Sequence, residues 1–291
     1  MCDNDIFDDM IKFTRPKETI SRRAFSSLAA GTGFIAMLPK VAGAVATKGS
    51  DVEIKTPDGT CDAYFVHPSS GKHPGVLIWP DIFGLRPAFK DMATRLAESG
   101  YSVLVINPFY RLQEAPTAPD HPNFNDPETR AALLKQMGTL SPTTAETDAK
   151  AFIPWLDKQA AVDTKKKLAT TGYCMGGPYV FRTAAFFPNR VGAAATFHGG
   201  GLVTNAPTSP HLLVPQMKAS FLVAIAMNDD AQQPDAKDKL KEAFAAAKLP
   251  AEIEVYQAQH GWCPPDAQVY NKELSEKAWD RQLVLFKKAL A

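Results

Sequence analysis

The sequence predicts an α/β fold in which a mostly parallel central sheet carries helices on both faces. From residue 75 to the end, short apolar runs alternate with segments of helical apolar spacing. Such alternation is typical of parallel strands that are joined by crossover helices. The apolar runs are also nearly uninterrupted, as expected for strands that are buried on both faces. Ligands of such folds bind beyond the carboxyl ends of the strands, so those loops are the first place to search for chemistry.

The expected elements follow in chain order. Residues 52–56 and 61–66 flank the turn Pro57-Asp58-Gly59 and predict an N-terminal β-hairpin. Further strands are expected at residues 75–79, 101–106, 168–172, 191–197, 221–226 and 253–256. Helices are expected at residues 87–99, 143–158, 175–187, 236–247 and 271–290. Residues 107–126 are rich in proline and have few periodic apolar positions, so they predict a long loop.

Composition places the chain among globular proteins. Of its 291 residues, 45% are hydrophobic and 22% are charged, which does not fit a disordered chain. The formal net charge is +1, without a basic stripe or an acidic tail. A nucleic-acid partner is therefore not expected. Residues 47–291 are expected to form a single α/β domain.

The N-terminal segment, residues 1–46, resembles a Tat export signal. Arg22-Arg23 precedes an apolar run at residues 28–38, and small-residue cleavage sites follow at Ala42-Gly43-Ala44 and Ala44-Val45-Ala46. The run is too short to span a bilayer, so no stable membrane insertion is expected after the signal is removed. The expected partner is the Tat export machinery and the expected location is the bacterial periplasm, or the cytoplasm if the signal does not function. The alternative is a frayed N-terminal helix with a chance arginine pair.

Cysteine usage points to chemistry rather than to metal binding. The four cysteines are Cys2, Cys61, Cys174 and Cys263, with no C-x-x-C pair and no Cys/His cluster at zinc-ligand spacing. Neither a metal site nor an organic cofactor is expected. Removal of the signal would leave three cysteines, so at least one thiol stays free even in an oxidising compartment.

Cys174 is the predicted nucleophile. The segment from Gly172 to Gly177 reads G-Y-C-M-G-G and lies between an expected strand and an expected helix. This is the G-x-S-x-G nucleophile elbow of the α/β-hydrolase fold, with cysteine in place of serine. Glycine tolerates the close approach of neighbouring backbone in such a turn, and the start of the next helix favours a thiolate. The alternative is a structural cysteine in a glycine-rich turn.

The predicted partners follow the nucleophile in the order acid, then histidine. His260 comes directly after the last expected strand, where the fold places its base, whereas His198 and His211 are interpreted as structural or surface histidines. Asp229 and Asp230 both follow the expected strand at residues 221–226. One carboxylate would orient the imidazole, and the other would cap the turn or the next helix.

The oxyanion hole is expected from two backbone N–H groups. His198-Gly199-Gly200-Gly201 looks like the oxyanion motif of lipases, but it follows Cys174 instead of preceding it, so it is interpreted as a glycine-rich loop near the site. The loop after residues 75–79 has the right position. We expect the N–H of Ile82, together with that of Met175, to face the developing oxyanion.

These residues resemble the dienelactone hydrolase (carboxymethylenebutenolidase) family over about residues 50–291. The resemblance implies a Cys-Asp-His triad on an α/β-hydrolase fold and the opening of unsaturated lactones that carry a carboxylate. The family's G-Y-C-x-G-G pattern matches Gly172 to Gly177. Its acid is followed four residues later by proline, as Asp230 is by Pro234, so the resemblance favours Asp230 over Asp229.

The same resemblance suggests further site residues. The family's histidine precedes an aromatic residue by two positions, which places Trp262 beside the substrate. Asp81 stands where the family has a glutamate that interacts with the resting cysteine. Arg111 matches an arginine that binds the substrate carboxylate, whereas a second family arginine, shortly after the histidine, is missing here.

The expected function is hydrolysis of a small-molecule ester or lactone through an acyl-thioester on Cys174. A serine esterase does not fit, because the chain has no G-x-S-x-G segment. The alternative from another class is a non-catalytic binding or thiol-redox protein on the same fold, in which Cys174 and Cys263 form a disulfide.

Overall fold

The computed structural model describes residues 38–119, 122, 124 and 126–291. Its centre is one eight-stranded sheet. The strands are β1 (Thr47–Thr56), β2 (Gly59–Pro68), β3 (Gly75–Trp79), β4 (Ser102–Ile106), β5 (Leu168–Tyr173), β6 (Val191–Phe197), β7 (Ser220–Ala226) and β8 (Ala251–Tyr256). Their order across the sheet is β1-β2-β4-β3-β5-β6-β7-β8. The β1–β2 and β2–β4 pairs are antiparallel and all other pairs are parallel, which confirms the predicted sheet.

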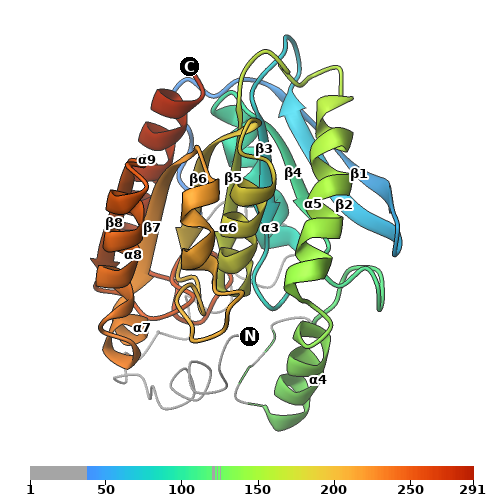
Figure 1. Ribbon diagram of the computed structural model, residues 1–291. Coiled ribbons are helices and arrows are strands. Elements are labelled where there is room, and N and C mark those ends of the chain that lie inside the picture. The colour runs from blue at the N-terminus through green and yellow to red at the C-terminus, as the bar shows by residue number, and fades with distance from the viewer. Residues whose placement is uncertain (1–37, 120–121, 123, 125) are drawn as a thin grey trace.

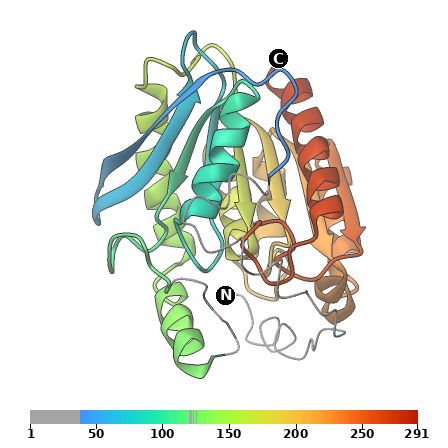
Figure 2. The same cartoon turned by 180° about the vertical axis from the view of Figure 1, so that it is seen from behind.

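Helices cover both faces of the sheet. In Figure 1 three helices lie in front of the strands: α5 (Pro142–Asp157), α6 (Gly177–Phe186) and α8 (Ala236–Ala246). Figure 2, from behind, shows two helices on the opposite face: α3 (Pro87–Glu98) and α9 (Lys272–Ala289). This three-layer arrangement covers both sides of the central strands, which is why every residue of β3 and β4 is buried.

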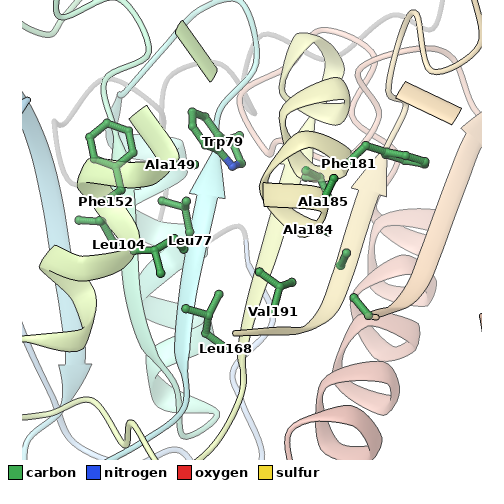
Figure 3. Close-up of a cluster of buried hydrophobic side chains, with 14 of the residues drawn as sticks. Leu77, Trp79, Leu104, Ala149, Phe152, Leu168, Phe181, Ala184, Ala185 and Val191 are labelled. Atoms are coloured by element: carbon green, nitrogen blue, oxygen red, sulfur yellow. The ribbon is translucent and has the colours of Figure 1, made fainter. Parts of the chain in front are cut away.

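The two faces of the sheet carry separate apolar cores. On the α5 and α6 side, Trp79, Phe152 and Phe181 are buried together with smaller residues of the strands (Figure 3). On the other side, Phe89 of α3 and Phe286 of α9 are fully buried against the sheet. Aromatic rings of this size remove a large apolar area from water, so the cores fix the positions of the strands between them.

The register of the parallel strands brings the loops at their carboxyl ends to one edge. Trp79 pairs with Gly172 at the ends of β3 and β5, and Ala226 pairs with Tyr256 at the ends of β7 and β8. Carboxyl ends of parallel strands meet at the same side of a sheet. The loops that carry Ile82, Cys174 and the residues after β6, β7 and β8 therefore start next to one another.

Two helices were not expected from the sequence. Helix α4 (Pro127–Met137) begins after the expected proline-rich loop, with the Asp126 side chain accepting the Thr129 N–H as its N-cap. Only Leu133 of α4 is buried, so its apolar pattern is too sparse to detect. Helix α7 (Met227–Gln232) follows β7 directly and buries none of its six residues. Figure 1 shows α4 and α7 beyond the same end of the sheet.

Residues 1–37 of the predicted export signal, including Arg22 and Arg23, lie outside the described residues, whereas residues 38–46 with both small-residue sites are described. The domain predicted for residues 47–291 begins where β1 begins, at Thr47. Within the described part of the chain, every helix is too short or too polar to cross a lipid bilayer.

Candidate active site

Cys174 lies at the tip of the turn between β5 and α6. Its φ of +52° is in the left-handed region that costs a non-glycine residue free energy. The two flanking glycines are required sterically. A Cβ on Gly172 would lie 2.4 Å from the Gly176 carbonyl oxygen, and a Cβ on Gly176 would lie 2.3 Å from the Trp79 carbonyl oxygen. The G-x-C-x-G pattern therefore follows from close backbone contacts at the elbow.

The His198 side chain supports the strained turn at Cys174 through a hydrogen bond. The backbone N–H of Cys174 donates to His198 Nδ1 at 3.1 Å, and the His198 ring is fully buried. Because Nδ1 accepts this bond, the ring proton resides on Nε2. Burial, followed by the proximity of His260, lowers the pKa of His198 well below its ordinary value, so the ring is neutral. Sequence analysis placed His198 near the site but missed this support of the nucleophile.

The His260 ring lies in the same pocket as Cys174. Its Nδ1 lies 2.9 Å from each carboxylate oxygen of Asp229. Burial alone would lower the pKa of His260, but the Asp229 carboxylate, followed by Cys174, raises it well above its ordinary value. The Cys174 side chain lines the same pocket as His260 and lies close enough to the ring to raise its pKa. The three side chains thus lie together, and the Asp229 carboxylate holds Nδ1 of the imidazole.

The preference for Asp230 as the acid was wrong, because Asp230 does not face His260. Its carboxylate pairs with Lys237 of α8 at 2.7 Å. Both aspartates belong to the short helix α7, and adjacent residues of a helix point about 100° apart. Only one of them can therefore reach the imidazole, and it is Asp229.

Further contacts fix the loop that carries His260. The His260 N–H donates to Asn228 Oδ1 at 2.8 Å, and the Met227 N–H donates to the Ala258 carbonyl at 3.0 Å. These bonds tie the start of α7 to the loop after β8. The separation of the His260 and Asp229 side chains is therefore fixed by a main-chain bond and by the Asn228 side chain. Nothing in the sequence pattern singled out Asn228.

Arg111 does not lie in the pocket beside Cys174, which corrects the predicted role in substrate binding. Its guanidinium donates to Asp148 at 2.7 and 3.0 Å and to Asp58 at 2.6 and 3.0 Å. The turn after β4 directs this side chain toward α5 and the β1–β2 turn. Arg111 therefore links the turn after β4 to α5 and to the β1–β2 turn, and it is not among the residues that line the pocket.

Trp262 also differs from its predicted place beside the substrate. It is fully buried and stacks on Tyr256, with 5.3 Å between the ring centroids. Its other neighbour is His198, whose ring centroid lies 5.1 Å away at a steep angle. Trp262 is not among the described residues that line the pocket, so it supports His198 from behind.

Asp81 lines the pocket, but its expected interaction with the thiol is replaced by an ion pair. Its two oxygens accept from Arg86 at 2.7 and 3.0 Å, and one of them also accepts the Phe83 N–H. Arg86 in turn donates to Asp266 at 2.6 and 3.0 Å. Among the described residues, Asp81 makes no hydrogen bond to Cys174. Arg86 and Asp266 are site residues that sequence analysis did not identify.

The pocket in front of Cys174 and His260 has largely apolar walls. Ile82, Phe83, Phe124 and Val269 line it. Ile82 and Met175 are both buried in one apolar cluster with Cys174. Their backbone positions, one after β3 and one after the nucleophile, are those expected of an oxyanion hole.

Other chemistry has little support in this part of the molecule. Among residues 38–119, 122, 124 and 126–291, no group of three or more His, Cys, Asp or Glu side chains is placed to hold a metal ion. Cys61, Cys174 and Cys263 are all buried free thiols. The disulfide of the redox alternative is therefore not formed in this structure.

The chain is similar to known proteins in sequence and in fold. The sequence profile of the dienelactone hydrolase family matches residues 61–290. The carboxymethylenebutenolidase of Rhodococcus opacus is 28% identical over 207 residues, which cover 69% of this chain and 75% of that protein. A protein of Methylorubrum extorquens is 26% identical over 287 residues, 94% of this chain and 95% of its own. A crystal structure from Klebsiella pneumoniae superposes with a TM-score of 0.72 at 24% identity and covers 84% of this chain and 99% of its own.

Proposed function

Because the chain belongs to the dienelactone hydrolase family, and is thus a hydrolase, we propose that it cleaves carboxylic esters or lactones through a covalent thioester on Cys174. The observation that carries the proposal is that Cys174 and His260 line one pocket, while Asp229 holds Nδ1 of the His260 ring. The name of the Rhodococcus opacus relative, carboxymethylenebutenolidase, supports the same class of substrate.

The first half of the reaction acylates the enzyme. The Cys174 sulfur attacks the carbonyl carbon, and the carbonyl electron pair moves to the oxygen, which accepts hydrogen bonds from the N–H groups of Ile82 and Met175. The tetrahedral intermediate then collapses, the bond to the leaving oxygen breaks, and His260 donates a proton to that oxygen. The products are an acyl-thioester and an alcohol, which stays attached to the acyl group when the substrate is a lactone.

The second half releases the acid. His260, now neutral, removes a proton from a water molecule, and the resulting hydroxide attacks the thioester carbonyl. The sulfur leaves as a thiolate beside the protonated imidazole, which restores the starting state. Asp229 stabilises the imidazolium and holds Nδ1, so that Nε2 serves both proton transfers.

The test is the activity of Cys174→Ala and Cys174→Ser on a panel of activated esters and lactones. Each variant is expected to lose kcat/KM by about 1,000-fold or more, since the nucleophile of such a triad carries most of the rate. Mass spectrometry of the wild type, quenched early in turnover and then digested with trypsin, should also detect one acyl group on the peptide that contains residue 174. Full hydrolysis by both variants would overturn the proposal.

We also propose that residues 1–46 direct export through the Tat machinery and that the mature enzyme acts in the periplasm. The support is the order of the arginine pair, apolar run and small-residue sites in the sequence.

A further inference from the structure

The pocket in front of Cys174 has few charged side chains among its described lining residues. Besides His260, the charged side chains among its described lining residues are Asp81, Arg86 and Asp266. Arg86 is the only lysine or arginine in that set. Whether the pocket can bind a negatively charged substrate therefore depends on whether Arg86 has a free N–H group.

Every N–H group of the Arg86 guanidinium already donates a hydrogen bond within the protein. A guanidinium carries five N–H bonds. Nε and Nη2 donate to the two oxygens of Asp266, while Nη1 and Nη2 donate to the two oxygens of Asp81. A fifth contact joins Nη1 to the Gly84 carbonyl. Because the side chain is also buried, a ligand would have to displace one of these partners to bind it.

The three side chains together carry a net negative charge. Each of the four carboxylate oxygens accepts an N–H from Arg86, which is the pattern of two ionised carboxylates around one cation. Burial alone would lower the pKa of Arg86, but Asp81 and then Asp266 raise it, so the guanidinium stays charged. Two negative charges and one positive charge leave an excess of one negative charge on the pocket wall.

Among the described lining residues, no second lysine or arginine compensates for this excess, and His260 is already paired with Asp229. Arg111, the other arginine considered for a substrate carboxylate, is held by Asp58 and Asp148 outside the pocket. The remaining described wall is mainly apolar, with Ile82, Phe124 and Val269, and its other polar side chains include the uncharged Gln259 and Gln268. A carboxylate placed against the apolar part would lose its water without gaining a cationic partner, which is costly in an apolar site.

We propose that this enzyme acts on uncharged esters or lactones with apolar substituents and discriminates against substrates that carry a carboxylate. The inference rests on the proposed function of Cys174 and adds the substrate class. Apolar walls favour the uncharged substituent, and the Asp81–Arg86–Asp266 group disfavours the anion.

The experiment compares methyl 4-acetoxybenzoate, which is neutral, with 4-acetoxybenzoate, which differs only by a free carboxylate. Each kcat/KM is divided by the ester's own hydroxide-catalysed rate constant, so that intrinsic reactivity cancels. At about 0.15 M salt the wild type should prefer the neutral ester by about tenfold or more. Equal use of the two esters, or a preference for the anion, would overturn the proposal.

Asp266→Asn tests the origin of the preference, because it removes one charge and keeps the shape of the side chain. The relative kcat/KM for the anionic ester should rise about tenfold. The matched control is Asp280→Asn, the same charge change on the exposed side of α9, which should leave the ratio within about twofold. An unchanged ratio in Asp266→Asn would overturn the assignment of the discrimination to this group.

The design separates this inference from the proposed function. The ratio is measured within one protein preparation, so partial misfolding of a variant lowers both rates and leaves the ratio intact. Cys174→Ala is assayed in parallel on both esters. If it hydrolyses them as fast as the wild type, the proposed function fails, whereas a loss of activity together with a wrong ratio rejects only the substrate class.

Discussion

The carboxylate of Asp229 holds Nδ1 of His260 with both of its oxygens at 2.9 Å, while its neighbour Asp230 turns away to Lys237. Asp229 and Asp230 are adjacent in α7, yet Asp229 contacts the His260 imidazole and Asp230 pairs with Lys237 of α8. This relationship gives the most direct test of the site.

Asp229→Asn should reduce kcat by about 100-fold to 10,000-fold, because an amide at this position favours the wrong imidazole tautomer and removes the charge that stabilises the cation. Asp230→Asn, the matched control one position away, should stay within about threefold of the wild type, since its ion pair is partly exposed. Steady-state hydrolysis of a neutral aryl ester gives both values. A severe loss in Asp230→Asn with a mild one in Asp229→Asn would restore the original assignment.

The raised pKa of His260 should make the folded state less stable as the pH rises. A group whose pKa is higher in the folded than in the unfolded protein contributes full stability below the unfolded value, about 6.5, and loses it as the pH passes through the folded value. Between about pH 6 and pH 9, the free energy of unfolding in urea should therefore fall more in the wild type than in His260→Gln. An equal or smaller fall in the wild type would mean that His260 is not held in its charged form.

Gly176→Ala should destabilise the protein by about 2–4 kcal/mol, because the new Cβ would meet the Trp79 carbonyl oxygen at 2.3 Å and backbone cannot move aside cheaply. The control is Gly138→Ala at the end of α4, where φ is −62° and the nearest atoms to a Cβ are 3.4 Å away. That variant should remain within about 0.5 kcal/mol of the wild type or be slightly more stable. Urea denaturation followed by circular dichroism measures both, and similar stabilities would argue against the steric account of the elbow.

Arg111→Met should lower stability without changing substrate preference. The substitution leaves the buried carboxylate of Asp148 without its cation, at a cost of about 3 kcal/mol. The double variant Arg111→Met/Asp148→Asn should recover part of that loss, because the unpaired charge is removed. If Arg111→Met instead leaves the melting temperature unchanged and alters the ratio of rates on the neutral and anionic acetoxybenzoates, Arg111 binds substrate after all.

Replacement of Arg22 and Arg23 by lysine should keep the full-length chain in the cytoplasm of a bacterial host, because the twin-arginine pair is the part of the signal that the Tat machinery reads. Cell fractionation and immunoblotting follow the protein. The control is lysine at Arg15, an arginine outside the pair, which should be exported as the wild type is. Periplasmic protein from the twin-lysine variant would show that export does not depend on the arginine pair.

The sequence was sufficient for the central strands and the elbow, because continuous apolar runs and glycine spacing are local signals. The runs around Leu77 and Leu104 mark strands buried on both faces. The glycines around Cys174 mark a turn whose backbone contacts exclude a Cβ. Both signals lie within a few residues and need no knowledge of distant parts of the chain.

The parts that could not be predicted depend on contacts between distant segments or on weakly patterned helices. Asp229 and Asp230 can be distinguished only once α7 exists, and that helix buries no residue that would reveal it. The pair of Arg86 and Asp266 joins residues 180 positions apart, so no local pattern encodes it. Arg111 was matched by its place after a strand, but its direction is set by the buried Asp148 on α5.

Helix α4 gives the protein a place where its preferences can diverge over evolution. Its single buried side chain, Leu133, packs in the same cluster as Ile82 and Cys174. Most of its other positions are free to drift, since they contribute little to folding. Leu134 and Met137 of α4 pack against the same cluster, so substitutions on this face of the helix can alter the packing around Ile82 while Cys174, His260 and Asp229 stay unchanged.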